Sequence, residues 1–150
     1  GMGKQDHDHD EIALPALLRA ARTVYGGAVR KALAQAGYDD IPKNGIFVIG
    51  AIARSGAPLG VIVRQLGVSK QAAGQLVDTL VMRGYLDREV DAEDRRRLTL
   101  SLSERGRAAA QVSRAAIARV DAALARKVDR EWIAHTRATL LALIGAGEGR

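Results

Sequence analysis

The sequence predicts a mainly α-helical protein that carries one small, two-stranded β-hairpin. Apolar residues recur at helical spacing along most of the chain, whereas residues 85–103 change to the alternating pattern of strands. Between the two expected strands lies a cluster of acidic and basic residues that ends in Arg95, Arg96 and Arg97. What such a charged hairpin tip binds depends on the elements around it.

The length and composition describe an ordinary globular chain. Its 150 residues suffice for one compact domain, or for one domain with a helical extension. The absence of cysteine excludes a disulfide framework and a thiolate zinc site, and it is typical of a cytoplasmic protein. No apolar run approaches the roughly 20 residues that a membrane span needs. We therefore expect no membrane partner and no cofactor.

The charge of the chain favours an anionic partner. The net charge is +6, distributed as −1 over residues 1–41, +3 over 42–106 and +4 over 107–150. A basic balance of this kind is typical of proteins that bind nucleic acids. The alternative is that the charge only keeps the chain in solution.

Residues 1–11 predict a disordered arm, because they are polar, acidic and unpatterned. In this arm His7 and His9 alternate with aspartates, which resembles a crude metal chelator. A tail of this kind fixes no ligand geometry, so we predict no metal site.

A first helix is predicted from Ile12 to about Ala36. Pro15 suits its first turn, where a missing N–H costs nothing, and Gly37 ends it. Its apolar residues follow helical spacing: Leu14, Leu17, Leu18, Ala21, Val24, Tyr25, Ala28, Val29 and Leu33.

Three further helices are predicted before the hairpin, over residues 42–54, 59–66 and 69–83. Pro42 opens the first of them, and Ser69 is a good N-cap for the third. Only a tight turn separates the second from the third, which is the arrangement of a helix-turn-helix.

The hairpin is predicted from the change of period. Residues 85–90 predict one strand, and in the next Leu98, Leu100 and Leu102 alternate with hydroxyl residues. The charged residues between the strands form the tip.

Two helices follow the hairpin, one over residues 104–127 and one that begins after Asp129. The order of elements is that of a winged helix-turn-helix domain at residues 42–103, flanked by helices at 12–37 and 104–146. The flanking helices carry more apolar surface than so small a domain can cover, so we expect them to form a homodimer interface.

The helix after the tight turn has the pattern of a DNA-reading helix, because helical spacing divides it into two sides. We assign to the packing side Ala72, Ala73, Leu76, Val77 and Leu80. We assign to the outward side Lys70, Gln71, Gly74, Gln75 and Asp78. Gln pairs with adenine and Lys with guanine or phosphate, and Gly74 leaves room for DNA. The alternative is a solvated helix without a partner.

The charged tip suits a minor groove. A positioned arginine at a protruding tip can enter a narrow minor groove, where the potential is most negative. Asp91 and Asp94 can orient neighbouring arginines. The alternative is a solvated charge cluster that prevents pairing of the strand edge.

Three stretches of the chain resemble the MarR (multiple antibiotic resistance regulator) family. The run D-x-x-D-x-R-x-x-x-L-x-L-S at residues 91–103 resembles the wing signature of that family, with Ser103 in place of its usual Thr. Residues 67–80 resemble its turn and recognition helix, and R-G-Y at residues 83–85 resembles its exit into the wing. The similarity spans about residues 12–146.

The resemblance implies a homodimeric transcriptional regulator, usually a repressor, whose two winged domains read a pseudo-palindromic operator in double-stranded DNA. It also implies that Asp94 and Arg96 pair to shape the wing, and that Arg95 or a neighbour enters the minor groove. Contacts to the major groove and its phosphates are implied for Ser69, Lys70, Gln71 and Gln75.

Many members of the family leave DNA when a small aromatic ligand binds between the dimer helices and the winged domain. The aromatic residues that we assign to such a site are Tyr25, Tyr38 and Phe47. Their alternative role is packing, since large aromatic side chains mostly pack.

Two other functions compete with DNA binding. An enzyme would have to use Asp91, Glu93 and Asp94, which lack a pocket and a His or Cys partner, so we expect no enzyme. A protein-interaction module is the remaining alternative, because a winged helix can also bind protein.

Overall fold

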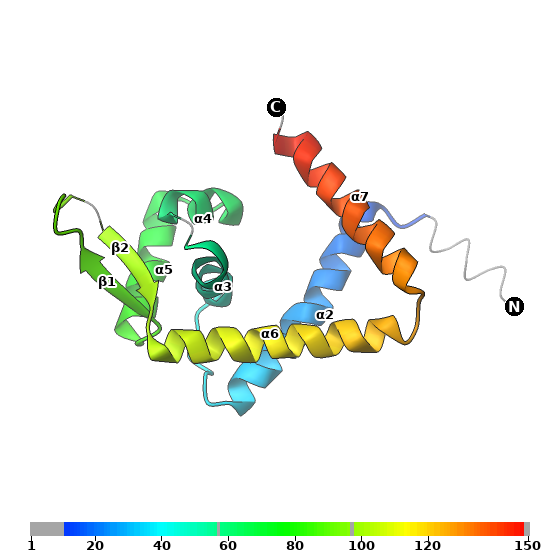
Figure 1. The fold of residues 1–150 in the computed structure, drawn as a ribbon, viewed down its shortest axis with the longest axis horizontal. Coiled ribbons are helices and arrows are strands. Elements are labelled where there is room, and N and C mark those ends of the chain that lie inside the picture. The colour runs from blue at the N-terminus through cyan, green and yellow to red at the C-terminus, as the bar shows by residue number, and fades with distance from the viewer. Residues whose placement is uncertain (1–10, 57, 97, 149–150) are drawn as a thin grey trace, which may run out of the picture. The chain divides into compact units, whose positions relative to one another are not determined.

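The computed structural model describes residues 11–56, 58–96 and 98–148 (Figure 1). Arg97 and residues 1–10 of the predicted arm lie outside the described residues. The described chain is mainly helical with one antiparallel hairpin, which confirms the predicted fold class. Its elements are α2 (Leu14–Gln35), α3 (Gly45–Ser55), α4 (Leu59–Leu66), α5 (Lys70–Met82), β1 (Leu86–Val90), β2 (Leu98–Leu102), α6 (Glu104–Ala125) and α7 (Arg130–Glu148).

The second predicted helix begins later than the sequence indicates. The prediction that Pro42 opens it is wrong, because α3 begins at Gly45. The N–H of Gly45 binds the carbonyl of Pro42 at 2.8 Å, which closes a turn. Within that turn Asn44 has a φ of 67°, and a residue in this left-handed conformation does not continue an α-helix.

The chain divides into two compact units, Gly1–Ala116 and Ile117–Arg150, with the boundary inside α6. The first unit is larger than the predicted domain of residues 42–103. Val29 and Leu33 of α2 and Ala109 of α6 are buried in the same hydrophobic core as the winged helix, so both helices contribute to this unit. The largest fully buried side chains of that core are Tyr85, Ile49, Ile62, Leu80, Leu86 and Val48.

The hairpin has one register that sorts its side chains onto two faces. Leu86 pairs with Leu102, and Arg88 pairs with Leu100. Because side chains alternate along a strand, these four residues share the face that lies toward α5, on which Leu86 and Leu102 are buried.

The second unit consists of the end of α6 and α7. Several large apolar side chains of α7 are exposed, among them Trp132 at 63% and Leu141 at 67% of their maximum area. Among the described residues, no helix combines the length and the apolar character that crossing a bilayer requires.

Candidate nucleic-acid interface

The turn before α5 positions that helix as the sequence predicts. Gly67 ends α4 in the left-handed conformation, with a φ of 67°, and its N–H binds the carbonyl of Val63. The Oγ of Ser69 accepts the N–H of Ala72 at 3.1 Å, which confirms the predicted N-cap of α5. Figure 1 shows the hairpin projecting beside α5. The tight turn and the cap therefore fix the start of α5, and the wing lies beside the helix.

The packing side of α5 is the predicted one except at one residue. Ala73, Val77 and Leu80 are buried and Leu76 packs partly buried against the same core. Ala72 is exposed, so its assignment to the packing side is wrong. It lies about 100° around the helix from Ala73, which takes it past the edge of the buried stripe.

The outward side of α5 is open to a partner. An added Cβ at half-buried Gly74 would meet no atom within 4 Å, so this position leaves space beside the helix. Exposed predicted contacts on this side are Ser69, Lys70, Gln71 and Gln75.

At the wing tip, aspartate side chains hold the backbone in short turns. An Oδ1 of Asp91 accepts the N–H of Glu93 at 2.9 Å, and an Oδ1 of Asp94 accepts the N–H of Arg96 at 3.1 Å. Such bonds over two residues are Asx-turns. The predicted pairing of Asp94 with Arg96 is loose, with 3.8 Å between the carboxylate and Nε.

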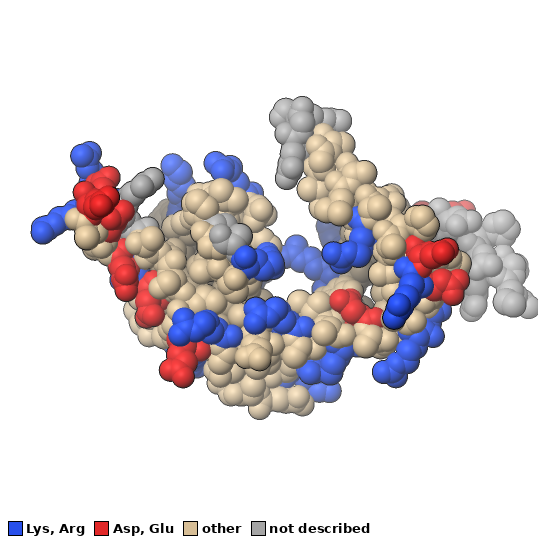
Figure 2. Space-filling model, in the orientation of Figure 1, with Lys and Arg blue, Asp and Glu red and all other residues tan. Residues whose placement is uncertain are grey.

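The side chains of Arg95 and Arg96 at the tip extend into solvent. The side chain of Arg96 is 96% exposed, and Arg95 is exposed as well. Figure 2 shows basic and acidic side chains gathered at this end of the hairpin. The acidic groups are therefore engaged in shaping the turn, while the guanidinium groups reach outward.

An ion pair between the wing and α5 was not visible in the sequence pattern. Arg88 of β1 donates from Nη2 to the carboxylate of Asp78 in α5. Asp78 was assigned only to the outward side of the helix, and Arg88 received no role. No sequence signal could have shown this pair, because only the fold places Arg88 on the face of β1 that lies toward α5.

The base of the wing is built from a second polar cluster, which joins three segments of the first unit. The hydroxyl of Tyr85 donates to Asp40, in the connection between α2 and α3. Arg105, at the start of α6, donates to the same carboxylate and to the Tyr85 hydroxyl, at 3.0 Å each. Its guanidinium also lies 4.5 Å from the Tyr85 ring centroid, a cation–π distance. We call Asp40, Tyr85 and Arg105 the base cluster.

The base cluster shifts the titration of its members. The hydrogen bond from Tyr85, with the positive charge of Arg105, lowers the pKa of Asp40 below its usual value. Burial, together with the acceptor Asp40, raises the pKa of Tyr85 above its usual value. Both shifts favour an ionised Asp40 beside a neutral Tyr85.

Ser103, which replaces the usual Thr of the wing signature, still provides a hydroxyl group that makes two hydrogen bonds. Ser103 donates from Oγ to the carbonyl of Gly84 and accepts the N–H of Gly106 at 3.0 Å. It therefore caps α6 and ties that helix to the segment entering β1. Gly106 allows this approach, because a Cβ there would lie 2.1 Å from the carbonyl oxygen of Tyr85.

The three aromatic residues assigned to a ligand site lie on three different segments of the chain. Tyr38 packs edge-on against Tyr85, with ring centroids 6.2 Å apart. Phe47 packs partly buried against the core from α3, and Tyr25 is half-buried in α2. Their assignment to a ligand stays a prediction.

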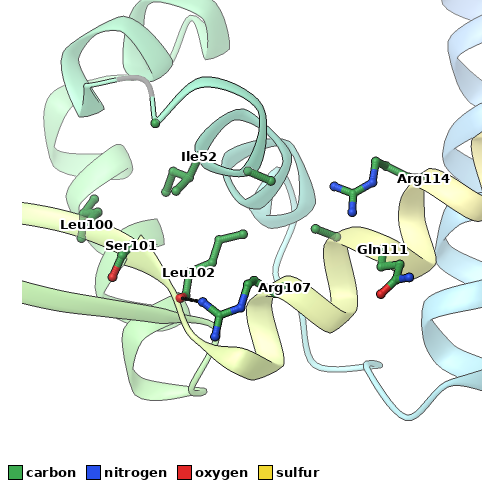
Figure 3. A pocket seen from close by; sticks show the side chains of 10 residues that line it. Ile52, Leu100, Ser101, Leu102, Arg107, Gln111 and Arg114 are labelled. Carbon is green, nitrogen blue, oxygen red and sulfur yellow. Dashed lines mark hydrogen bonds between the residues drawn. The ribbon is translucent and has the colours of Figure 1, made fainter.

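A cavity of about 540 Å³ opens between α3, β2 and α6, and none of these aromatic residues lines it. Figure 3 shows Ile52 and Leu102 as part of its apolar lining, whereas Arg107, Gln111 and Arg114 come from α6. Arg107 also donates to the carbonyl of Leu102 at 3.0 Å. The cavity thus combines apolar walls with two guanidinium groups. Across the described residues, no cluster of His, Asp and Glu could hold a metal ion.

Comparison with known proteins identifies the winged part of the chain. The sequence model of the MarR family matches residues 40–97. No curated protein sequence matches the chain.

Solved structures match over nearly the whole length. A variant of MepR from S. aureus bound to an oligodeoxyribonucleotide has 18% identity and a TM-score of 0.55, covering 91% of this chain and 99% of that one. The MarR family protein Rv2887 of Mycobacterium tuberculosis, in complex with salicylic acid, has 24% identity and a TM-score of 0.64, covering 90% and 98%. The transcriptional regulator Tm0710 of Thermotoga maritima has 24% identity and a TM-score of 0.58, covering 88% and 92%.

These matches confirm the resemblance to the MarR family at residues 40–97 and the winged helix-turn-helix fold. Residues 40–97 are thus similar to the MarR family, within a fold that the chain shares with solved structures over about nine-tenths of its length.

Proposed function

We propose that the protein is a sequence-specific, DNA-binding transcriptional regulator. The observation that carries the proposal is the exposed outward side of α5, capped at Ser69, beside a wing whose tip directs arginines into solvent. In helix-turn-helix proteins such a helix enters the major groove and the wing contacts the adjacent backbone or minor groove. The MepR structure bound to an oligodeoxyribonucleotide supports a DNA partner for this fold.

Each exposed residue then has a definite role. Gln71 and Gln75 read base edges, whereas Ser69 and Lys70 bind phosphates at the start of α5. At the wing, Arg95 or Arg96 enters the minor groove, and Asp91 and Asp94 shape the turn that presents them. Gly74 lets the helix approach the DNA closely.

We further propose a homodimer that acts as a repressor of a pseudo-palindromic operator in the cytoplasm. Each compact unit exposes large apolar side chains that a second copy would cover. In α2 they include Leu14 at 65% and Val24 at 61% exposure, and in α7 Trp132 and Leu141. Two winged domains related by two-fold symmetry would read two half-sites of opposite orientation.

A small ligand would act through the cavity between α3, β2 and α6. Two arginines beside apolar walls suit an aromatic molecule that carries a negative charge. The complex of Rv2887 with salicylic acid, which is such a molecule, supports this class. Because β2 belongs to the wing, a ligand in this cavity would affect the element that presents the arginines.

Selection of bound sequences from random duplex DNA tests the proposal. We expect enrichment of a two-fold symmetric motif, and a binding constant that falls steeply with salt because phosphate contacts release counterions. Absence of any enriched duplex would contradict direct DNA readout and favour a protein-interaction module.

A further inference from the structure

The ion pair between the wing and α5 occupies an unexpected position. Arg88 lies on the face of β1 that is turned toward α5, opposite Leu100 in the register of the hairpin. From there it reaches the carboxylate of Asp78. The side chains are 35% and 63% exposed, so the pair lies at the surface.

Asp78 belongs to the outward side of α5, on the same line as the predicted DNA contacts. It follows Gly74 by four residues and Gln75 by three, which is the spacing of neighbours on one helix face. A bare carboxylate at this place would face the phosphates of a bound duplex. Like charges brought together at an interface weaken binding and exclude partners.

We propose that Arg88 is a positioning residue for DNA binding, which neutralises Asp78 and joins the wing to the recognition helix. This inference rests on the proposed function. Arg88 need not contact DNA itself, because its guanidinium is bound to the carboxylate that would otherwise repel the phosphates. An exposed ion pair contributes little to folding, so the effect of Arg88 is expected on DNA affinity rather than on unfolding.

A cycle of four proteins on the selected duplex tests the inference: wild type, Arg88→Gln, Asp78→Asn and the double variant. Arg88→Gln should weaken binding about tenfold at low salt, the scale on which one uncompensated charge acts. Adding Asp78→Asn should restore affinity to within about threefold of wild type. Asp78→Asn alone should change affinity by less than about threefold, because Arg88 already neutralises the carboxylate.

Matched charge changes exclude a general electrostatic effect. The variant Arg88→Gln with Glu89→Gln has the same net charge as the rescued double variant, but Glu89 lies on the opposite face of the hairpin. This variant should still bind the duplex about tenfold more weakly than wild type. Thermal unfolding of each variant checks that the domain remains folded.

Three results would overturn the inference. If Arg88→Gln binds the duplex as tightly as wild type, the ion pair makes no contribution to DNA binding. If Asp78→Asn changes DNA affinity equally in wild type and in Arg88→Gln, the two charges act independently. If it changes affinity more in wild type than in Arg88→Gln, Arg88 binds phosphate on its own. Failure of wild type to bind any duplex would instead remove the proposed function, and this inference with it.

Discussion

The base and the tip of the wing use similar residues for opposite purposes. At the base, Asp40, Tyr85 and Arg105 bond across segments that are far apart in the sequence, around a tyrosine that is fully buried. At the tip, Asp91 and Asp94 bond to backbone N–H groups only two residues away. Long-range bonds fix where the hairpin leaves the domain, whereas local bonds shape a turn and leave its arginines to solvent. We therefore expect changes at the base to affect folding and changes at the tip to affect binding.

The largest effect on stability is expected for Gly106→Ala. The added Cβ would collide with the carbonyl oxygen of Tyr85, a backbone atom that cannot rotate away. We expect a loss of about 3 kcal/mol in the free energy of unfolding, the upper range for overpacking. Urea denaturation measures it.

Gly60→Ala in α4 is the matched control, because an added Cβ there would meet no atom within 4 Å. Its free energy of unfolding should stay equal or rise by up to about 1 kcal/mol, since alanine favours helices. Similar losses for both variants would show that the base is not closely packed at Gly106.

A smaller effect is expected for Tyr85→Phe. This change keeps the buried ring and removes the hydroxyl that binds Asp40 and Arg105. Because the Asp40 side chain is 40% exposed, water can replace the lost hydrogen bond in part. We therefore expect the free energy of unfolding to fall by about 1 kcal/mol. Tyr38→Phe is the control, since the described hydrogen bonds of the cluster run through Tyr85. An equal cost for both variants in urea denaturation would contradict the assigned role of the Tyr85 hydroxyl.

The base cluster should also give stability a pH dependence of less than about 1 kcal/mol, because solvent screens Asp40. The pKa of Asp40 is lower in the folded than in the unfolded chain, so its contribution is complete above the ordinary value of 3.8 and is lost as pH falls through the folded pKa. The pKa of Tyr85 is raised, so its contribution is complete below the ordinary value of 10.0 and is lost as pH rises above it.

Unfolding measured across pH tests both directions. Asp40→Asn should remove the loss at low pH that belongs to this group, and it should reduce the loss at high pH because Asp40 contributes to the raised pKa of Tyr85. Tyr85→Phe should remove its part of the loss at high pH and reduce the loss at low pH, because the Tyr85 hydroxyl is the main cause of the Asp40 shift. Variants with the pH profile of wild type would refute this assignment.

The smallest effect on stability is expected for the double change of Arg95 and Arg96 to Ala. Both side chains are exposed, and the nearest ion pair of Arg96 is a loose one. The free energy of unfolding should change by less than about 0.5 kcal/mol. A loss as large as that of Tyr85→Phe would mean that the tip also holds the fold together.

Local patterns in the sequence predicted the elements of the fold, because each depends on neighbouring residues. The N-cap at Ser69 and the alternation of the second strand are examples, and both are present. The predicted start of α3 was wrong because the left-handed conformation of Asn44 depends on its tertiary surroundings. The assignment of Ala72 to the packing side was wrong because the width of a buried stripe depends on what packs against it.

The contacts that join elements could not be predicted in the same way. Arg88 and Asp78 meet because β1 lies along α5, and Asp40 meets Tyr85 across 45 positions of the chain. Charge spacing shows neither pair, since each requires the tertiary fold. The cavity between α3, β2 and α6 is a third example, because its lining comes from three separate segments.

A salt titration of DNA binding, for wild type and for the variant with Arg95 and Arg96 changed to Ala, tests the division between base and tip most directly. On the selected duplex, the account predicts that the variant binds about 100-fold more weakly and that its dependence of log K on log salt is shallower by about 0.9 for each lost phosphate contact. Its unfolding should remain that of wild type. An unchanged affinity and salt slope, in a protein that binds the duplex, would contradict the claim that the wing tip contacts DNA.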